Sequence, residues 1–214
     1  MKTTKNLLAL AAAATLALAA GSVGAESQYG YASPSTAAAV TAQARVILSV
    51  AVPKMILLRV GTSSGTGDTL SWTYALNAAT SPGATPSNGS NQTADWDAAA
   101  PTSALSGTAP AALAASAWTN SVGGGSLSYI ATAFTSASGG TGPTLANVTV
   151  TAAGGTGLGH PGAATLAASS GASPVTFGAL SVATGNWTYV LGGTPSSWNA
   201  GTYTATVTYT ATSV

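Results

Sequence analysis

The sequence GTYTATVTYTA, at residues 201–211, alternates hydroxyl and apolar side chains without a break after its first glycine. Every even position from 202 to 210 is threonine, and the odd positions from 203 onward carry tyrosine, alanine or valine. Successive side chains of a strand point to opposite faces, so this period of two predicts a strand with one buried and one solvated face. We expect the buried face to comprise Tyr203, Ala205, Val207, Tyr209 and Ala211.

Further strand-like segments lie upstream, and turn-forming Gly, Pro, Ser and Asn residues separate them. The compact apolar run at residues 54–60 predicts a strand that is more fully buried than the segment before it. The Ala-rich residues 98–117 could hold one short helix. A long helix is not expected there, because the segment contains two prolines and a glycine. Other strands are expected at residues 70–76, 126–135, 145–152, 174–182 and 186–191. Short strands divided by such turns predict an all-β protein built as an antiparallel β-sandwich.

Residues 36–52 form a second alternating segment, which ends at Pro53. Its period of two predicts one long strand. Two roles remain open for it, as the first strand of the protein's own sheet or as a strand that is donated to a neighbouring molecule. In either role the apolar face comprises Val40, Ala42, Ala44, Val46 and Leu48.

The N-terminus has the layout of a secretory signal peptide. Lys2 and Lys5 precede an apolar run that ends at Ala20, and small residues at 23 and 25 predict cleavage after Ala25. We therefore divide the chain into a signal peptide at 1–25, an N-terminal extension with the first strand at 26–52, and a β-sandwich domain at 53–214. The product is expected at the cell surface or outside the cell, without membrane insertion after cleavage.

The composition argues against several classes of partner. Only 4% of the residues are charged, against about 25% in ordinary soluble proteins. The sequence therefore offers no basic patch for nucleic acid, and little charge repulsion opposes self-association. Cysteine is absent, so the chain has no disulfide and no thiolate site for a metal or a nucleophile.

Few residues suit catalysis, and we expect no enzymatic activity, no cofactor and no metal site. His160 is the only histidine, and its Gly- and Pro-rich surroundings predict an exposed turn. Asp95 and Asp97 are the only close pair of carboxylates, and a solvated loop explains them better than a glycosidase or a Ca²⁺ site. The Gly-rich stretches 123–125 and 154–157 lack the lysine of a phosphate-binding loop.

Tryptophan is the residue type best suited to binding a ligand. Trp72 and Trp187 occupy the apolar faces of expected strands, where core packing is the usual role. Three others are expected in loops, where their rings could stack on sugars: Trp96, Trp118 and Trp198.

The stretch GTYTATVTY, at residues 201–209, resembles the closing strand of bacterial pilin-like proteins of the chaperone–usher type, particularly the spore coat U or archaic pilin group. The resemblance implies an immunoglobulin-like antiparallel β-sandwich whose missing strand is donated by the N-terminal segment of a neighbour. It also implies partners, namely copies of the chain or related subunits, a periplasmic chaperone and an outer-membrane usher. Many members of that group carry a disulfide, which this chain cannot form.

We therefore expect a structural subunit of a bacterial surface filament or fimbria, assembled by β-strand addition. A secreted carbohydrate-binding or adhesin module that uses the loop tryptophans is the alternative. A secreted hydrolase ranks third.

Overall fold

The computed structural model describes residues 27–33, 39–62, 67–77, 88–92, 96, 98–106 and 108–214. The expected signal peptide, the start of the alternating N-terminal segment at 36–38, and both Asp95 and Asp97 lie outside these residues. The chain divides into two units between Val52 and Pro53.

The second unit is all-β, and its strands pair antiparallel. No α-helix occurs in the described residues, and none of their helical turns is long and apolar enough to cross a membrane. Two 3-10 turns lie at Leu145–Asn147 (η1) and Pro195–Ser197 (η2). The strands are β1 Ile56–Val60, β2 Tyr74–Asn77, β3 Thr102–Leu105, β4 Leu113–Thr119, β5 Gly125–Ala131, β6 Val148–Ala153, β7 Val175–Phe177, β8 Ala183–Leu191 and β9 Val207–Ser213.

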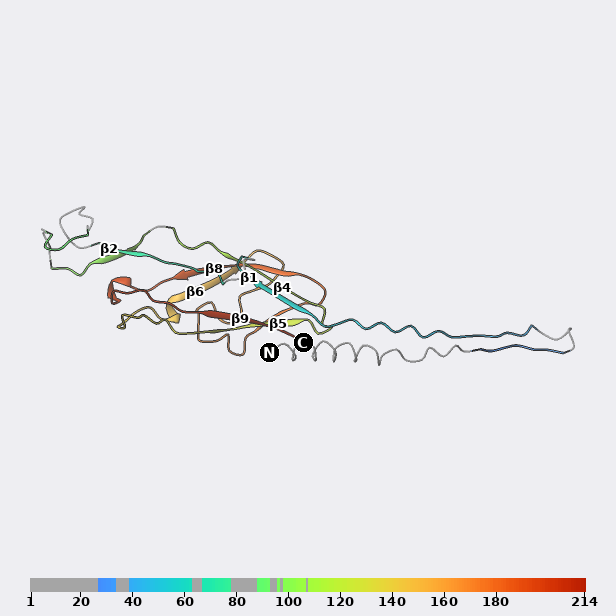
Figure 1. The fold of residues 1–214 in the computed structure, drawn as a ribbon. Coiled ribbons are helices and arrows are strands. Elements are labelled where there is room, and N and C mark those ends of the chain that lie inside the picture. The colour runs from blue at the N-terminus through green and yellow to red at the C-terminus, as the bar shows by residue number, and fades with distance from the viewer. Residues whose placement is uncertain are drawn as a thin grey trace, which may run out of the picture. The chain divides into compact units, whose positions relative to one another are not determined.

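These strands form three sheets (Figure 1). The largest has the order β1-β4-β8-β6, the second has the order β7-β5-β9, and β2 and β3 form a two-stranded ribbon. The C-terminal strand β9 runs along the whole of β5, with Tyr209 opposite Tyr129 and Ala211 opposite Leu127. In the strand order, the C-terminal strand lies at one end of the three-stranded sheet.

The four-stranded and three-stranded sheets contribute to one common core. Trp187 of β8 and Leu127 of β5 are both 0% exposed. Inward and outward side chains alternate along both strands, as the period of two requires. Glycine at 185 permits a close approach to this core, because a Cβ atom there would lie 2.2 Å from the Leu158 carbonyl oxygen. The core thus fixes both sheets and the loop that contains Leu158.

Most of the expected strands of the second unit are confirmed, and the differences have physical reasons. The expected helix within residues 98–117 is wrong, because β3 and most of β4 occupy this segment. Alanine lies on both faces of β4, so the two faces do not differ enough in hydropathy for the sequence to indicate which positions are buried. β1 is less buried than expected, since it is the end strand of its sheet and Leu57 is 55% exposed.

The described part of the first unit differs from the sequence expectation. No residue of 39–52 belongs to a strand, although the segment runs as an extended trace (Figure 1). Its side chains are exposed, with Val46 at 79% and Leu48 at 87%. An alternating pattern encodes an apolar face but not the strand that pairs with it. The expectation of a paired first strand is therefore wrong for residues 39–52 within a single copy.

The buried tryptophan gives a direct test of the core. Replacing Trp187 with alanine removes a fully buried ring, and we expect it to lower the free energy of unfolding by about 3–5 kcal/mol. Replacing Trp96, which is 62% exposed, is the control and should change this free energy by less than about 0.5 kcal/mol. Urea denaturation followed by circular dichroism measures both, and equal losses would contradict the assigned core.

Candidate functional site

The outer backbone edges of β1 and β9 are the first candidate for a functional site. β1 ends the four-stranded sheet and β9 ends the three-stranded sheet, and the two strands approach each other. Within the described part of the chain, no backbone hydrogen bond joins either outer edge to another segment. The outer edge of β6 differs, because Val150 N donates to Ala164 O at 2.7 Å and Leu166 N donates to Val148 O at 2.8 Å.

Apolar side chains beside these edges are only half-buried. Val207, Tyr209 and Ala211 of β9 pack against the core but are only half-buried, whereas Tyr129 and Leu127, the β5 partners of Tyr209 and Ala211, are buried. The inward side chains of β1 are half-buried in the same way: Ile56, Leu58 and Val60. An added strand beside β9 would bury the remaining apolar surface and pair the exposed backbone groups.

The first residues of the second unit are held by side-chain hydrogen bonds that the sequence did not reveal. Asn120 Oδ1 accepts a bond from Met55 N at 2.7 Å, and Asn120 Nδ2 donates to Pro53 O at 2.7 Å. The Thr119 hydroxyl donates to Met55 O at 2.9 Å. These bonds fix the residues at which the second unit begins, immediately after the alternating segment.

The other predicted assembly residues are distributed as follows. Val207 and Tyr209 lie in β9, whereas Tyr203 and Ala205 precede it. The Tyr203 hydroxyl lies 2.9 Å from Thr141 O and 2.8 Å from Asn199 O and shares its one hydrogen between them, and the next residue, Thr204, forms an isolated bridge with Thr135. On the first unit, Val40, Ala42 and Ala44 are exposed, as are Val46 and Leu48.

His160 does not lie in an exposed turn, so that expectation is wrong. Its ring packs among four aromatic rings, and the centroid distances to Tyr129 and Trp187 are both 5.2 Å. Its Nε2 atom lies 2.7 Å from the Tyr209 hydroxyl, which is hydrogen-bonded in turn to the Tyr189 hydroxyl. The indole of Trp187 donates to Leu158 O at 3.2 Å and draws the His160 loop onto the core.

Burial sets the charge of this cluster. Desolvation lowers the pKa of His160 to about 4, so the imidazole is neutral at pH 7. Desolvation also raises the pKa of Tyr209 and that of Tyr189, so both hydroxyls stay protonated. A histidine-based triad would require a carboxylate beside the ring, whereas the neighbours of this ring in the described structure are aromatic residues.

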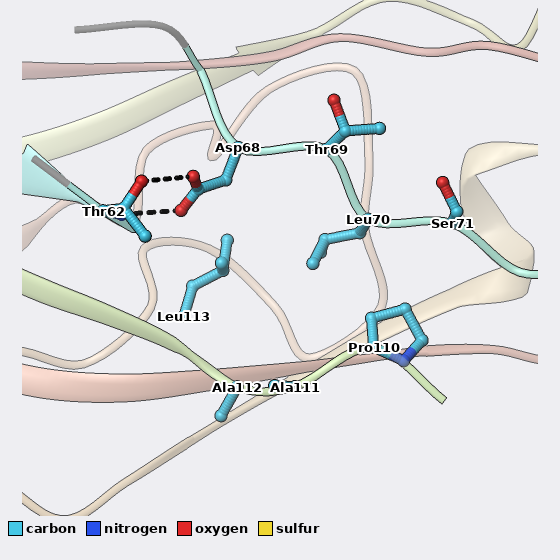
Figure 2. A pocket seen from close by; sticks show the side chains of 9 residues that line it. All are labelled: Thr62, Asp68, Thr69, Leu70, Ser71, Pro110, Ala111, Ala112 and Leu113. Atoms are coloured by element: carbon cyan, nitrogen blue, oxygen red, sulfur yellow. Dashed lines mark hydrogen bonds between the residues drawn. The ribbon is translucent and has the colours of Figure 1, made fainter. Parts of the chain in front are cut away.

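Among the described residues, no group of three or more His, Asp or Glu side chains could hold a metal ion. A pocket of ≈ 350 Å³ is lined on one side by Thr62, Asp68 and Leu70, and on the other by residues 110–113 (Figure 2). Both carboxylate oxygens of Asp68 face Thr62, accepting its backbone N–H at 2.6 Å and its hydroxyl at 2.7 Å. These bonds lower the pKa of Asp68. Each oxygen of the Asp68 carboxylate therefore accepts one hydrogen bond from Thr62.

The three candidate stacking tryptophans have different surroundings. Trp118 lies in β4 opposite Leu57, so its expected loop position is wrong. Trp198 follows η2 and packs edge-to-face with Tyr74 at a centroid distance of 6.3 Å. The Trp96 indole donates to Ala99 O at 2.8 Å. In the described structure no ring contact joins any two of the three.

The Tyr209 hydroxyl joins the two sheets, and its removal tests the cluster. Replacing Tyr209 with phenylalanine leaves His160 Nε2 and the Tyr189 hydroxyl without their shared partner. We expect a loss of about 1–3 kcal/mol in the free energy of unfolding, because the orphaned groups stay buried. Urea denaturation measures it, with exposed Tyr31→Phe as the control. Equal values for the two variants would argue against the network.

Comparisons with protein-family models, curated proteins and solved structures find no significant match to this chain. Its function is therefore argued from its own residues.

Proposed function

We propose that this protein is a non-catalytic structural subunit of a bacterial surface filament, and that copies of the chain join by β-strand addition. In this proposal residues 53–214 form an immunoglobulin-like antiparallel β-sandwich that lacks one strand. The alternating N-terminal segment of one copy adds to the outer edge of β9 in the next copy. The observation that carries the proposal is the unpaired edge of β9, with its half-buried apolar side chains, in a chain that also has an exposed alternating segment.

The donor and acceptor match in chemistry. A strand repeats its side-chain direction every second residue, so Val46 and Leu48 can both face the same surface. β9 places Val207, Tyr209 and Ala211 on its inward face with the same period. Backbone hydrogen bonds would supply affinity for any extended partner, and the alternating apolar side chains would fix the register.

The acceptor strand also lacks the usual protection against pairing. Monomeric β-proteins commonly block exposed edges with charged residues, proline or a covering segment. The sequence of β9, VTYTATS, has neither a charged residue nor a proline. Because the described structure forms no backbone bond along its outer edge, another strand could pair there without displacing one.

The proposal also includes how the chain reaches the surface. A signal peptide at 1–25 would direct export, and a periplasmic chaperone would cover the apolar edge until an outer-membrane usher adds the subunit to the filament. These partners follow from the resemblance of the C-terminal strand to chaperone–usher pilins. The unpaired edge of β9 gives a physical reason for a chaperone, since such edges promote aggregation.

One pair of variants tests strand addition. Replacing Val46 with aspartate places a charge on the apolar face of the donor, and we expect at least a tenfold loss of assembled protein, because an unpaired buried charge costs several kcal/mol. Ser49→Asp adds the same charge on the opposite face and should assemble normally. Negative-stain microscopy and gel mobility without boiling measure the outcome. The proposal fails if Val46→Asp assembles as well as Ser49→Asp.

A carbohydrate-binding or adhesin module remains the second candidate, because the Trp96 ring is largely exposed. Replacing Trp96 with alanine should then reduce binding to a glycan array by at least about fivefold, since stacking of a ligand on an exposed aromatic ring contributes on the order of 1 kcal/mol or more. Filament formation should not change. Unchanged glycan binding would remove Trp96 from this role.

A further inference from the structure

The His160 cluster connects the acceptor strand to the opposite sheet. Tyr209 belongs to β9 of the three-stranded sheet, and Tyr189 belongs to β8 of the four-stranded sheet. Their hydroxyls are hydrogen-bonded to each other, and the Tyr209 hydroxyl also contacts His160 Nε2. The two sheets and the loop of residues 157–162 therefore meet at one hydroxyl group.

The loop is held at this point by several contacts. Leu158 is buried, its N–H donates to Thr184 O at 3.0 Å, and its carbonyl accepts the Trp187 indole. Pro161 is also fully buried. His160 therefore cannot leave the aromatic cluster without moving a loop that packs on β8.

We propose that His160 is an acid-sensitive latch, which in its neutral form positions β9 through Tyr209 and on protonation leaves the cluster and releases that strand. The consequence for assembly rests on the proposed function, because β9 is the acceptor there. Acidification would then loosen the strand to which the donated segment binds.

The surroundings of His160 explain why its protonated form is disfavoured. The groups that face it are Tyr129 of β5, Tyr189 and Trp187 of β8, and Tyr209 of β9. The three tyrosines are the titratable ones, and each carries no charge when its phenol is protonated. Burial lowers the pKa of His160, and in the described part of the chain no carboxylate interaction opposes this effect.

The pH window follows from the two states of the latch. In the closed state the pKa of His160 is about 4, whereas its ordinary value in a solvated loop is 6.5. Between these two pH values the open state, with His160 in solvent, binds more protons than the closed state, with His160 in the cluster. The free energy that favours the closed state is therefore largest above pH 6.5 and decreases as the pH falls toward 4. His160 is the chain's single histidine, so no second imidazole titrates in this window.

Hydrogen exchange of the β9 amides tests the latch without requiring assembly. We expect protection factors, corrected for intrinsic exchange, to fall by at least about tenfold between about pH 7 and about pH 4.5. His160→Gln keeps a neutral hydrogen-bonding group and should remove this pH dependence. His160→Phe fills the same aromatic space without a titrating group, and serves if the glutamine variant does not fold. A pH dependence that persists in a folded non-titrating variant would overturn the proposal.

A second variant separates a latch from simple structural support. Tyr209→Phe removes the hydroxyl through which His160 holds β9, so β9 should already be less protected at about pH 7 and should lose little further protection on acidification. The amides of β6 serve as the internal control, because the hydrogen bond that His160 makes to Tyr209 belongs to β9 and not to β6. An equal pH-dependent loss in β6 and β9 would indicate global unfolding and contradict a local latch.

The link to assembly is measured on polymers of the wild type and of His160→Gln. Wild-type polymers should dissociate or exchange subunits at about pH 4.5 at least about tenfold faster than polymers of the variant. Equal rates would contradict an effect of His160 on the polymer. Hydrogen exchange of the β9 amides would still show whether protonation of His160 releases this strand. A failure to form polymers at any pH would contradict the proposed function, and the exchange of β9 amides in the monomer would again decide the latch.

Discussion

The unpaired outer edge of β9 is the constraint on which this account depends. A backbone N–H or C=O group that is removed from water needs a hydrogen-bond partner, so a sheet must end in solvent, under a covering segment or against another strand. Residues 164–166 cover the edge of β6, whereas in the described chain no backbone hydrogen bond joins the outer edge of β9 to β1, the strand that approaches it. The half-buried side chains of β9 indicate the same incompleteness from the apolar side of the strand.

The buried aromatic cluster explains why β9 can hold its position despite this open edge. One side of the strand pairs with β5, and Tyr209 bonds across to Tyr189 and His160. At the end of β9 the Ser121 hydroxyl donates to Val214 O, and Val214 N donates to Gly124 O at 2.9 Å. An acceptor strand must be rigid to offer a defined register, and these contacts supply that rigidity without using its outer edge.

The sequence predicted the features that depend on local patterning. β5, β6 and β8 follow from alternation of large apolar and small polar residues, and the burial of Trp187 follows from its place on the apolar face. β4 was not predicted, because alanine occupies both its buried and its exposed face and removes the difference in hydropathy that reveals a period of two. The C-terminal strand begins only at Val207, because the ladder is interrupted at Thr206, whose N–H donates to the Thr132 hydroxyl, and before it only Thr204 pairs, in an isolated bridge with Thr135.

The candidate site was only partly predictable, because its main features depend on contacts between distant residues. The approach of β1 to β9 and the clamp of Asn120 on Met55 arise from tertiary packing. Glycine and proline around His160 do indicate a turn, but they do not show that Leu158 draws this turn into the core. Two inward tyrosines on β8 and β9 were a usable signal, since buried hydroxyls require a hydrogen-bond partner.

Cross-linking between copies tests strand addition at β9 most directly, because the chain has no native cysteine. Chains with Ser49→Cys would be mixed with chains that carry one cysteine on the outward face of β9, at Thr208, Thr210 or Thr212. The account predicts disulfide-linked dimers between the two kinds of chain for at least one of these positions, since disulfides require Cα atoms within about 7 Å. Thr149→Cys on the outward face of β6 is the control. Cross-linking to β9 that never exceeds cross-linking to Thr149→Cys would contradict the central claim.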